Sequence, residues 1–196
     1  MLYGVVRNPT EMSGEAIPNT AELECELRSL ESKTTLVIYQ VHQSFLYSIF
    51  GDHSKGAKLA LKRGDYFFRV SVGCPTAMPD TFHRGISLFD TARRTRKATH
   101  KRAAKKTLSK MKKWAKDNPN VVHTLKILEA EQFALNGNKE KACLAYERSI
   151  ALSARSGMLQ DAALANERSG EYLLNEIKDE DKAVHYFGKA IGYYKD

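Results

Sequence analysis

Residues 51–58, Gly-Asp-His-Ser-Lys-Gly-Ala-Lys, come nearest in this chain to a phosphate-binding loop. Such a loop ends in Gly-Lys-Ser or Gly-Lys-Thr, because the lysine must reach the phosphates and the hydroxyl must reach Mg²⁺. Gly56 is followed here by Ala57 and Lys58, so neither group is in register. A protein-kinase catalytic loop and an Asp-Phe-Gly motif are also missing from the sequence. We therefore predict no nucleotide-binding site and no cofactor.

The histidines and carboxylates indicate no catalytic or metal chemistry either. None of the six histidines stands at zinc-ligand spacing from another histidine or a cysteine, and His42, in an apolar run, is predicted to be a hydrogen-bonded core residue. Glu167 and Glu171 lie one helical turn apart, but Arg168 beside them is typical of a solvent-exposed helix face. We predict no catalytic residue, no metal ligand and no enzymatic activity. The carboxylates Glu167 and Glu171, with Tyr172, are candidates for contact with a partner.

A basic segment is the most prominent chemical feature of the chain. Residues 93–116 contain twelve Lys or Arg residues and no acidic residue, whereas the rest of the chain holds 19 basic and 23 acidic residues. Apolar residues recur at helical spacing from Ala104 to Ala115, which predicts a helix over about 99–116 with this stripe facing inward and the cations outward. The candidate partner-binding cations are Arg93, Arg94, Arg96, Lys97, Lys101, Arg102, Lys105, Lys106, Lys110, Lys112, Lys113 and Lys116.

Three interpretations of this basic helix stay open. It can be a solvated face that pairs with an acidic helix of the same protein or of a neighbouring domain. It can dock an acidic protein segment or an anionic membrane surface. It can bind nucleic acid through the phosphates, although Trp114 is the only aromatic residue of the segment that could stack on a base. The charge pattern favours these interpretations in this order, and the partner that we expect is a protein.

Hydrophobic spacing and turn residues predict an all-α protein. An irregular leader over 1–20 precedes a helix through Leu23, Leu27 and Leu30. Tight turns are expected near Gly51, near Arg96, at Gly137 and at Lys178, and they divide a domain over 21–196 into four helix hairpins, 33–72, 77–117, 121–156 and 158–196. The predicted helices of these hairpins cover about 34–50, 52–72, 78–93, 99–116, 121–136, 139–155, 159–175 and 179–195.

An internal repeat supports this division. The pattern of residues 141–153 recurs 41 residues later, at 182–194, and the end of the preceding helix recurs at a shorter offset, 133–136 against 172–175. The second repeat therefore has two extra residues in its turn. Helix–turn–helix units at a fixed period are typical of an α-solenoid, in which each hairpin buries its apolar face against a neighbour. We expect Ile191 and Tyr194 in the last helix to be partly exposed.

The composition is that of a globular chain in a reducing compartment. Hydrophobic residues make up 42% and charged residues 28% of the sequence, which is not typical of a disordered protein. It has no apolar run long enough for a membrane-spanning helix, and its N-terminal apolar stretch is too short for a signal peptide. The cysteines Cys25, Cys74 and Cys143 are odd in number and far apart, so we predict no disulfide framework and a cytoplasmic location.

Several short motifs suggest a known family of helical repeats. They include Phe50-Gly51-Asp52, Trp114-Ala115-Lys116, Ala163-Leu164-Ala165-Asn166-Glu167 and Glu171-Tyr172-Leu173. From Gly51 onward the chain resembles the tetratricopeptide-like region that follows the ATPase module in very large multidomain signalling kinases. It is also similar to the repeats of large LuxR-type ATP-dependent transcription regulators.

The resemblance implies a non-catalytic scaffold or regulatory module in signal transduction. Such a module would hold a helical surface for a protein partner or transmit strain between adjacent domains. In the family, kinase and ATPase domains precede the repeats, and the repeat pattern continues beyond the position matching Asp196. The resemblance therefore implies, as an alternative, a fragment of a kinase polypeptide whose catalytic domains are missing here. Its catalytic activities correspond to no residue of this chain.

Overall fold

The protein is built from α-helices joined by short turns. The computed structural model describes residues 20–29, 33–70 and 73–195, and it has no strand within them. The predicted leader lies outside the described residues, except for Thr20, which begins the first helix. The elements are α1 (Thr20–Ser29), α2 (Lys33–Ile49), α3 (His53–Arg63), α4 (Tyr66–Val70), α5 (Ala77–Thr95), α6 (Ala98–Asp117), η1 (Pro119–Val121), α7 (Val122–Leu135), α8 (Lys139–Arg155), α9 (Leu159–Tyr172), η2 (Leu173–Ile177) and α10 (Glu180–Lys195).

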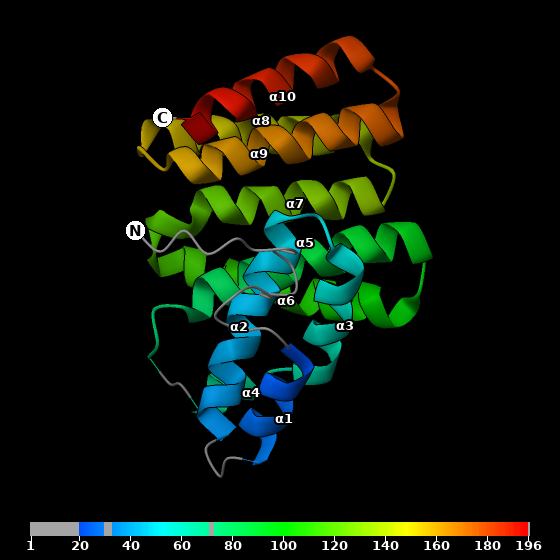
Figure 1. Ribbon diagram of the computed structural model, residues 1–196. Helices are drawn as coiled ribbons and strands as arrows, with labels where there is room; N and C mark the ends of the chain where they lie inside the picture. The colour runs from blue at the N-terminus through cyan, green and yellow to red at the C-terminus, as the bar shows by residue number, and fades with distance from the viewer. Residues whose placement is uncertain (1–19, 30–32, 71–72, 196) are drawn as a thin grey trace.

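Three helix hairpins stack on one another in the C-terminal part of the chain: α5–α6, α7–α8 and α9–α10 (Figure 1). The two helices of each hairpin pack together, α7 also packs on α5, and α9 packs on α8 and α7. Helices α1 to α4 lie at the end of the stack opposite α10, where α2 and α3 pack on α5. This arrangement is the all-α solenoid that the repeat predicted.

Residues with a left-handed backbone stand at the predicted turns. Gly51, Arg96, Gly137 and Lys178 have φ angles of 74°, 58°, 75° and 68°. A positive φ reverses the chain after a helix and prevents the helix from continuing. In the α7–α8 turn the next helix starts on a side-chain cap, because Asn138 accepts a hydrogen bond from the N–H of Lys141 at 3.2 Å. The four turns that were predicted from sequence are confirmed.

Two predicted helices are interrupted. The helix expected over 52–72 ends at Arg63, because Gly64 has a φ of 55° and its N–H bonds to the carbonyl of Ala60, and α4 then begins at Tyr66. The helix expected over 159–175 changes at Leu173 into the π-helical turn η2. A π-helical turn holds more residues than an α-helical one. This turn ends at Ile177, directly before Lys178, so it lies where the second repeat is longer than the first.

The apolar core runs continuously through the stack. It includes fully buried side chains on α5, α7 and α8, such as Phe89, Leu128 and Tyr146, and it reaches α3 at Ala57 and Ala60. A smaller cluster joins Val37 and Val41 of α2 to Phe67 of α4. The prediction that His42 is a core residue is wrong: the side chain is exposed, and its Nδ1 lies 2.9 Å from the carbonyl oxygen of Ile38. Helix α2 buries the face that carries Val37 and Val41, and His42 lies outside it.

The last helix leaves apolar side chains in solvent. Ile191 and Tyr194 are 54% and 51% exposed, as the repeat predicted. Across the described residues, no helix combines the length and the apolar character that a bilayer crossing requires.

Candidate interaction surface

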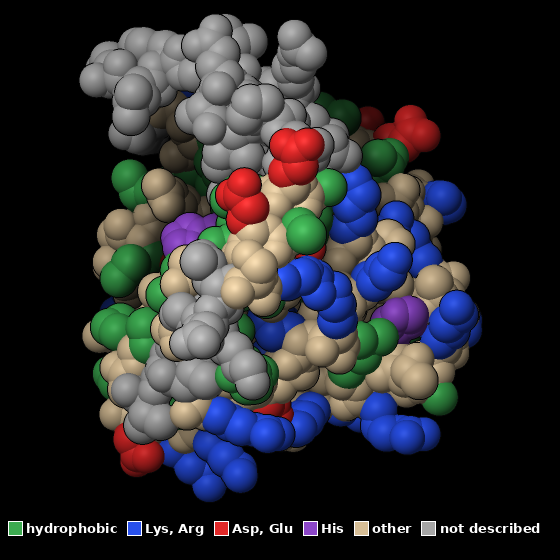
Figure 2. Space-filling model, turned by 60° about the horizontal axis from the view of Figure 1, so that its bottom comes forward, with side chains coloured by type: hydrophobic (Ala, Val, Ile, Leu, Met, Phe, Trp, Pro, Cys, Tyr) green, Lys and Arg blue, Asp and Glu red, His purple; other side chains and the backbone are tan. Residues whose placement is uncertain are grey.

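Helix α6 carries the basic segment in the way its periodicity predicted. Ala104, Leu108 and Met111 are at most 2% exposed, and Ala115 packs against the same core. The lysines and arginines therefore project from the other sides of the helix, and such side chains gather on the lower and right-hand parts of the face in Figure 2. A helix held by a buried stripe presents these charges on a rigid support.

Three lysines of α6 are neutralised within the protein. Lys106 and Lys110 each place Nζ 2.6 Å from a carboxylate oxygen of Asp65, which follows α3, and Lys112 Nζ lies 3.4 Å from Glu129 Oε1 of α7. Burial alone would raise the pKa of Asp65, but its hydrogen bonds and charge interactions with Lys106 and Lys110 lower it to about 2. The interpretation of the basic helix as a face that pairs with acidic residues of the same protein is thus correct for these three lysines.

Apart from Arg93, the other cations of this region fall into two groups. Arg94 forms an ion pair with Asp90 of its own helix. Seven more have no carboxylate within ion-pair distance among the described residues; Lys101 is half-buried and the other six are exposed. We call these seven the α6 surface: Arg96, Lys97, Lys101, Arg102, Lys105, Lys113 and Lys116.

Arg93 and Tyr172 do not lie on the surface, where the sequence placed them. Arg93 is 9% exposed and donates from Nη1 to Glu131 Oε2 at 3.0 Å. Tyr172 is 3% exposed and packs against the ring of Tyr146, with the ring centroids 5.9 Å apart. Both predictions of surface exposure are wrong, because each side chain projects from its helix toward the neighbouring helices of the solenoid.

Glu167 and Glu171 remain at the edge of the protein, but both have partners. Glu171 forms an ion pair with Arg168, which is 2% exposed, so this part of α9 is not the solvated face that the sequence suggested. Glu167 accepts a hydrogen bond from the hydroxyl of Tyr194 at 2.8 Å. Glu171 thus forms its contact within α9, and Glu167 links α9 to α10. Neither carboxylate forms part of the α6 surface.

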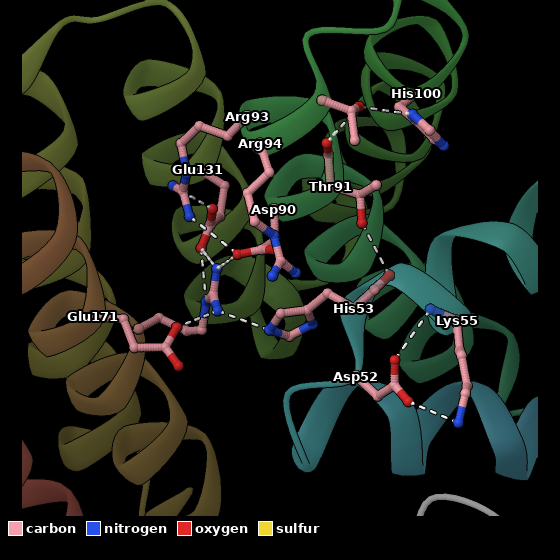
Figure 3. A network of polar contacts seen from close by, with 12 residues as sticks. Asp52, His53, Lys55, Asp90, Thr91, Arg93, Arg94, His100, Glu131 and Glu171 are labelled. Carbon is pink, nitrogen blue, oxygen red and sulfur yellow. Dashed lines mark hydrogen bonds and ion pairs between the residues drawn. The ribbon is translucent and has the colours of Figure 1, made fainter.

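A buried polar network, which the sequence analysis missed, is centred on Glu131 of α7. This carboxylate is fully buried, and it accepts hydrogen bonds from Tyr146 Oη at 2.9 Å and from Arg168 Nε at 2.8 Å, besides that from Arg93. Figure 3 shows Glu131 facing Arg93. Burial would raise the pKa of Glu131, but the charges of Arg168 and Arg93 outweigh it and lower the pKa to about 2. The network joins α5, α7, α8 and α9, and we assign it a structural role.

His53 extends this network to the N-terminal helices. Arg168 donates from Nη1 to Nε2 of His53 at 3.0 Å, and Thr91 donates from its hydroxyl to the His53 carbonyl at 3.0 Å (Figure 3). Burial, followed by the positive charge of Arg168, lowers the pKa of His53 to about 4. The imidazole is therefore neutral at neutral pH, and its Nε2 accepts the hydrogen bond from Arg168. The sequence carries little signal for this network, because Glu129 stands two positions before Glu131, and Arg168 lies between Glu167 and Glu171.

Comparisons with known proteins identify one matching family. A family model described as soluble NSF attachment protein (SNAP) matches residues 78–196, more than half of the chain, from the start of α5 to the end of the sequence. No curated protein and no solved structure matches. In the described residues, no group of three His, Cys, Asp or Glu side chains could hold a metal ion. The match supports the tetratricopeptide-like repeat of the resemblance, while the kinase architecture finds no support in it. The chain belongs to the soluble NSF attachment protein family.

Proposed function

We propose that this protein is a non-catalytic adaptor that binds an acidic segment of a protein partner along the α6 surface. The family name describes proteins that attach to NSF, and a helical-repeat scaffold for protein interaction is the role that the family suggests for this chain. The observation that carries the proposal is the group of seven cations on and beside α6 that have no carboxylate partner among the described residues. Complementary carboxylates on a partner would speed association and orient it.

The buried side of α6 makes this proposal physically reasonable. Isolated ion pairs between flexible surface side chains contribute little free energy, roughly 0.2–1 kcal/mol each. Leu108 and Met111 hold α6 in place before a partner binds, so its cations can contact the partner together. Binding then does not have to include the entropy cost of ordering the helix backbone. Lys106, Lys110 and Lys112 already have internal partners, so the uncompensated charge of the basic segment 93–116 is confined to the α6 surface.

A charge-reversal experiment tests the proposal. Arg102→Glu, Lys105→Glu, Lys113→Glu and Lys116→Glu are combined in one variant. A control variant combines Lys58→Glu, Lys178→Glu, Lys189→Glu and Lys195→Glu, which are also exposed and change the net charge equally. Binding of a fluorescent Glu/Asp-rich peptide is measured by anisotropy at low and at physiological salt. We expect roughly a tenfold or greater loss of affinity in the α6 variant and little change in the control.

Two outcomes would contradict the proposal. Equal losses in both variants would mean that only net charge matters. Tighter binding of a single-stranded or duplex oligonucleotide than of the acidic peptide, with loss in the α6 variant, would favour the nucleic-acid interpretation. The role in signal transduction, and the alternative of a kinase polypeptide with further domains, stay predictions. Sequencing the transcript that encodes the chain would test them by showing whether kinase or ATPase domains accompany it.

A further inference from the structure

A surface groove lies beside the α6 surface, over α7 and α8. It has a volume of about 240 Å³, and its floor includes Phe133 of α7 and Leu144 of α8. Leu144 is 47% exposed, and Phe133 is half-buried against the main core. Lys141 Nζ lies 6.0 Å from the centroid of the Phe133 ring. The groove therefore combines an apolar floor with a cationic edge.

The charges around this groove are unbalanced. Lys126, Lys141 and Arg148 line it, and Glu129 is the one carboxylate among its lining residues. Glu129 is already neutralised from two sides: its Oε2 lies 2.8 Å from Lys126 Nζ, and its Oε1 lies 3.4 Å from Lys112 Nζ of α6. The groove as a whole is positive, so it would repel a basic ligand and attract an acidic one.

Glu129 also makes the groove continuous with α6. Lys112 reaches it from α6 and Lys126 from α7, so one cation of α6 lies directly beside the cations that line the groove. Helix α7 packs on both α6 and α8. Lys141 and Arg148, seven residues apart on α8, line the groove, and Lys105 and Lys112 of α6 have the same spacing but lie outside its lining. Seven residues are two helical turns, about 10 Å.

We propose that this groove binds an acidic amphipathic helix, which places a large apolar side chain against Leu144 and Phe133. Carboxylates seven residues apart on the helix would face Lys141 and Arg148, and the apolar anchor would lie between them, as Leu144 lies between the two cations. This inference rests on the proposed function: the helix belongs to the same acidic partner, and the groove supplies the contact that charge alone cannot, recognition of an apolar anchor.

The test uses two peptides of equal charge and the full-length protein. One is a helical acidic peptide with a leucine between two glutamates that are seven residues apart, and the other has serine in place of this leucine. We expect the leucine peptide to bind about fivefold more tightly by fluorescence anisotropy. Leu144→Ala should abolish this advantage and leave the affinity for the serine peptide unchanged. Leu61→Ala, at a leucine of α3 with a similar exposure of 42%, should preserve the advantage.

A second variant gives a gain of affinity. Glu129→Gln removes the one carboxylate that lines the groove, so both peptides should bind more tightly, and circular dichroism would confirm that the fold is kept. Equal affinity for the two peptides, or an advantage that survives Leu144→Ala, would overturn the groove proposal while leaving the α6 surface intact. Binding of neither peptide would overturn the proposed function, and the groove proposal with it.

Discussion

At the scale of single residues, the internal charges decide which cations can act on a partner. Arg93 belongs by sequence to the basic segment, yet it lies in the core against Glu131. Lys113 lies one position after Lys112 and remains in solvent, whereas Lys112 reaches Glu129. The pairing depends on carboxylates far along the chain, so sequence spacing within the segment does not reveal it.

Removal of the Glu131 carboxylate should destabilise the fold. Glu131→Ala removes the closer of the two carboxylates that Arg93 and Arg168 share and leaves only Asp90 between them, so we expect a loss of about 3–5 kcal/mol in the free energy of unfolding. Urea denaturation followed by circular dichroism measures it. Glu167→Ala is the control, because this half-buried carboxylate bonds to the exposed Tyr194, and its loss should cost no more than about 1 kcal/mol. Similar losses in the two variants would contradict the structural role of the network.

His53 should make stability sensitive to mild acid. Its pKa is lowered to about 4 in the folded protein from its ordinary value of 6.5, so the unfolded chain takes up the proton first as the pH falls. Stability is complete above pH 6.5 and is lost progressively toward pH 4, by about 2 kcal/mol between pH 7 and pH 5 from this residue. Arg168, Asp90, Glu131 and Arg94 are the charged groups that act on it.

The measurement is the urea midpoint at pH 7 and at pH 5. His53→Gln should reduce the change in the urea midpoint between pH 7 and pH 5. His42→Gln, at the exposed histidine of α2, should leave this change as large as in the parent protein. Part of the difference should remain in His53→Gln, because burial also lowers the pKa of His83 to about 4. An unchanged difference would show that His53 does not titrate in this way.

At the scale of the helices, a few glycines lie so close to a neighbouring helix that a side chain there would meet its atoms. Gly170 of α9 faces the ring of Phe187 on α10, and a Cβ built on it would lie 2.8 Å from a ring carbon. Gly188, one residue after Phe187, has nothing within 4 Å of the same position. The two glycines look alike in the sequence, since each lies within a helical segment, and only the packing of α9 on α10 separates them.

This contrast predicts opposite effects of the same substitution. Gly170→Ala should destabilise the protein by roughly 1–3 kcal/mol, because the ring of Phe187 must move. Gly188→Ala should stabilise it by roughly 0.5–1 kcal/mol, because alanine restricts the unfolded chain and favours the helix. Thermal unfolding followed by circular dichroism gives both values. Destabilisation by Gly188→Ala would mean that the exposed side of α10 is more crowded than the structure shows.

At the scale of the whole molecule, the N-terminal helices are fastened to the repeats. The SNAP family match begins only at residue 78, yet α3 contributes Ala57 and Ala60 to the main core and His53 to the Glu131 network. On the other side, Phe68 of α4 stacks near Trp114 of α6, with ring centroids 5.9 Å apart. One core and one network therefore connect both parts of the chain.

A single unfolding transition is the expected result. Trp114 is the only tryptophan of the chain and reports on the contact between α4 and α6, whereas circular dichroism reports on all helices. Because the core is continuous from α3 to α9, the two signals should change at the same urea concentration. A tryptophan transition at lower urea would show instead that the N-terminal helices detach first, as independent units of a repeat protein do.

The sequence by itself determined the helices and their turns. Hydrophobic spacing and residues such as Gly137 and Asn138 act on their neighbours in the chain, so the hairpins after residue 77 could be predicted almost to the residue. The break at Gly64 and the π-helical turn after Tyr172 also have local causes, but the apolar pattern continues across them and concealed them.

Only the tertiary structure decided which charged and apolar groups remain available to a partner. It buried Arg93 and Tyr172, paired Lys106 with Asp65, and left Leu144 exposed in a cationic groove. The physical reason is distance along the chain. An ion pair or a packing contact forms between residues tens of positions apart, and a helical period indicates which side of a helix is buried but not which residue of another helix it meets.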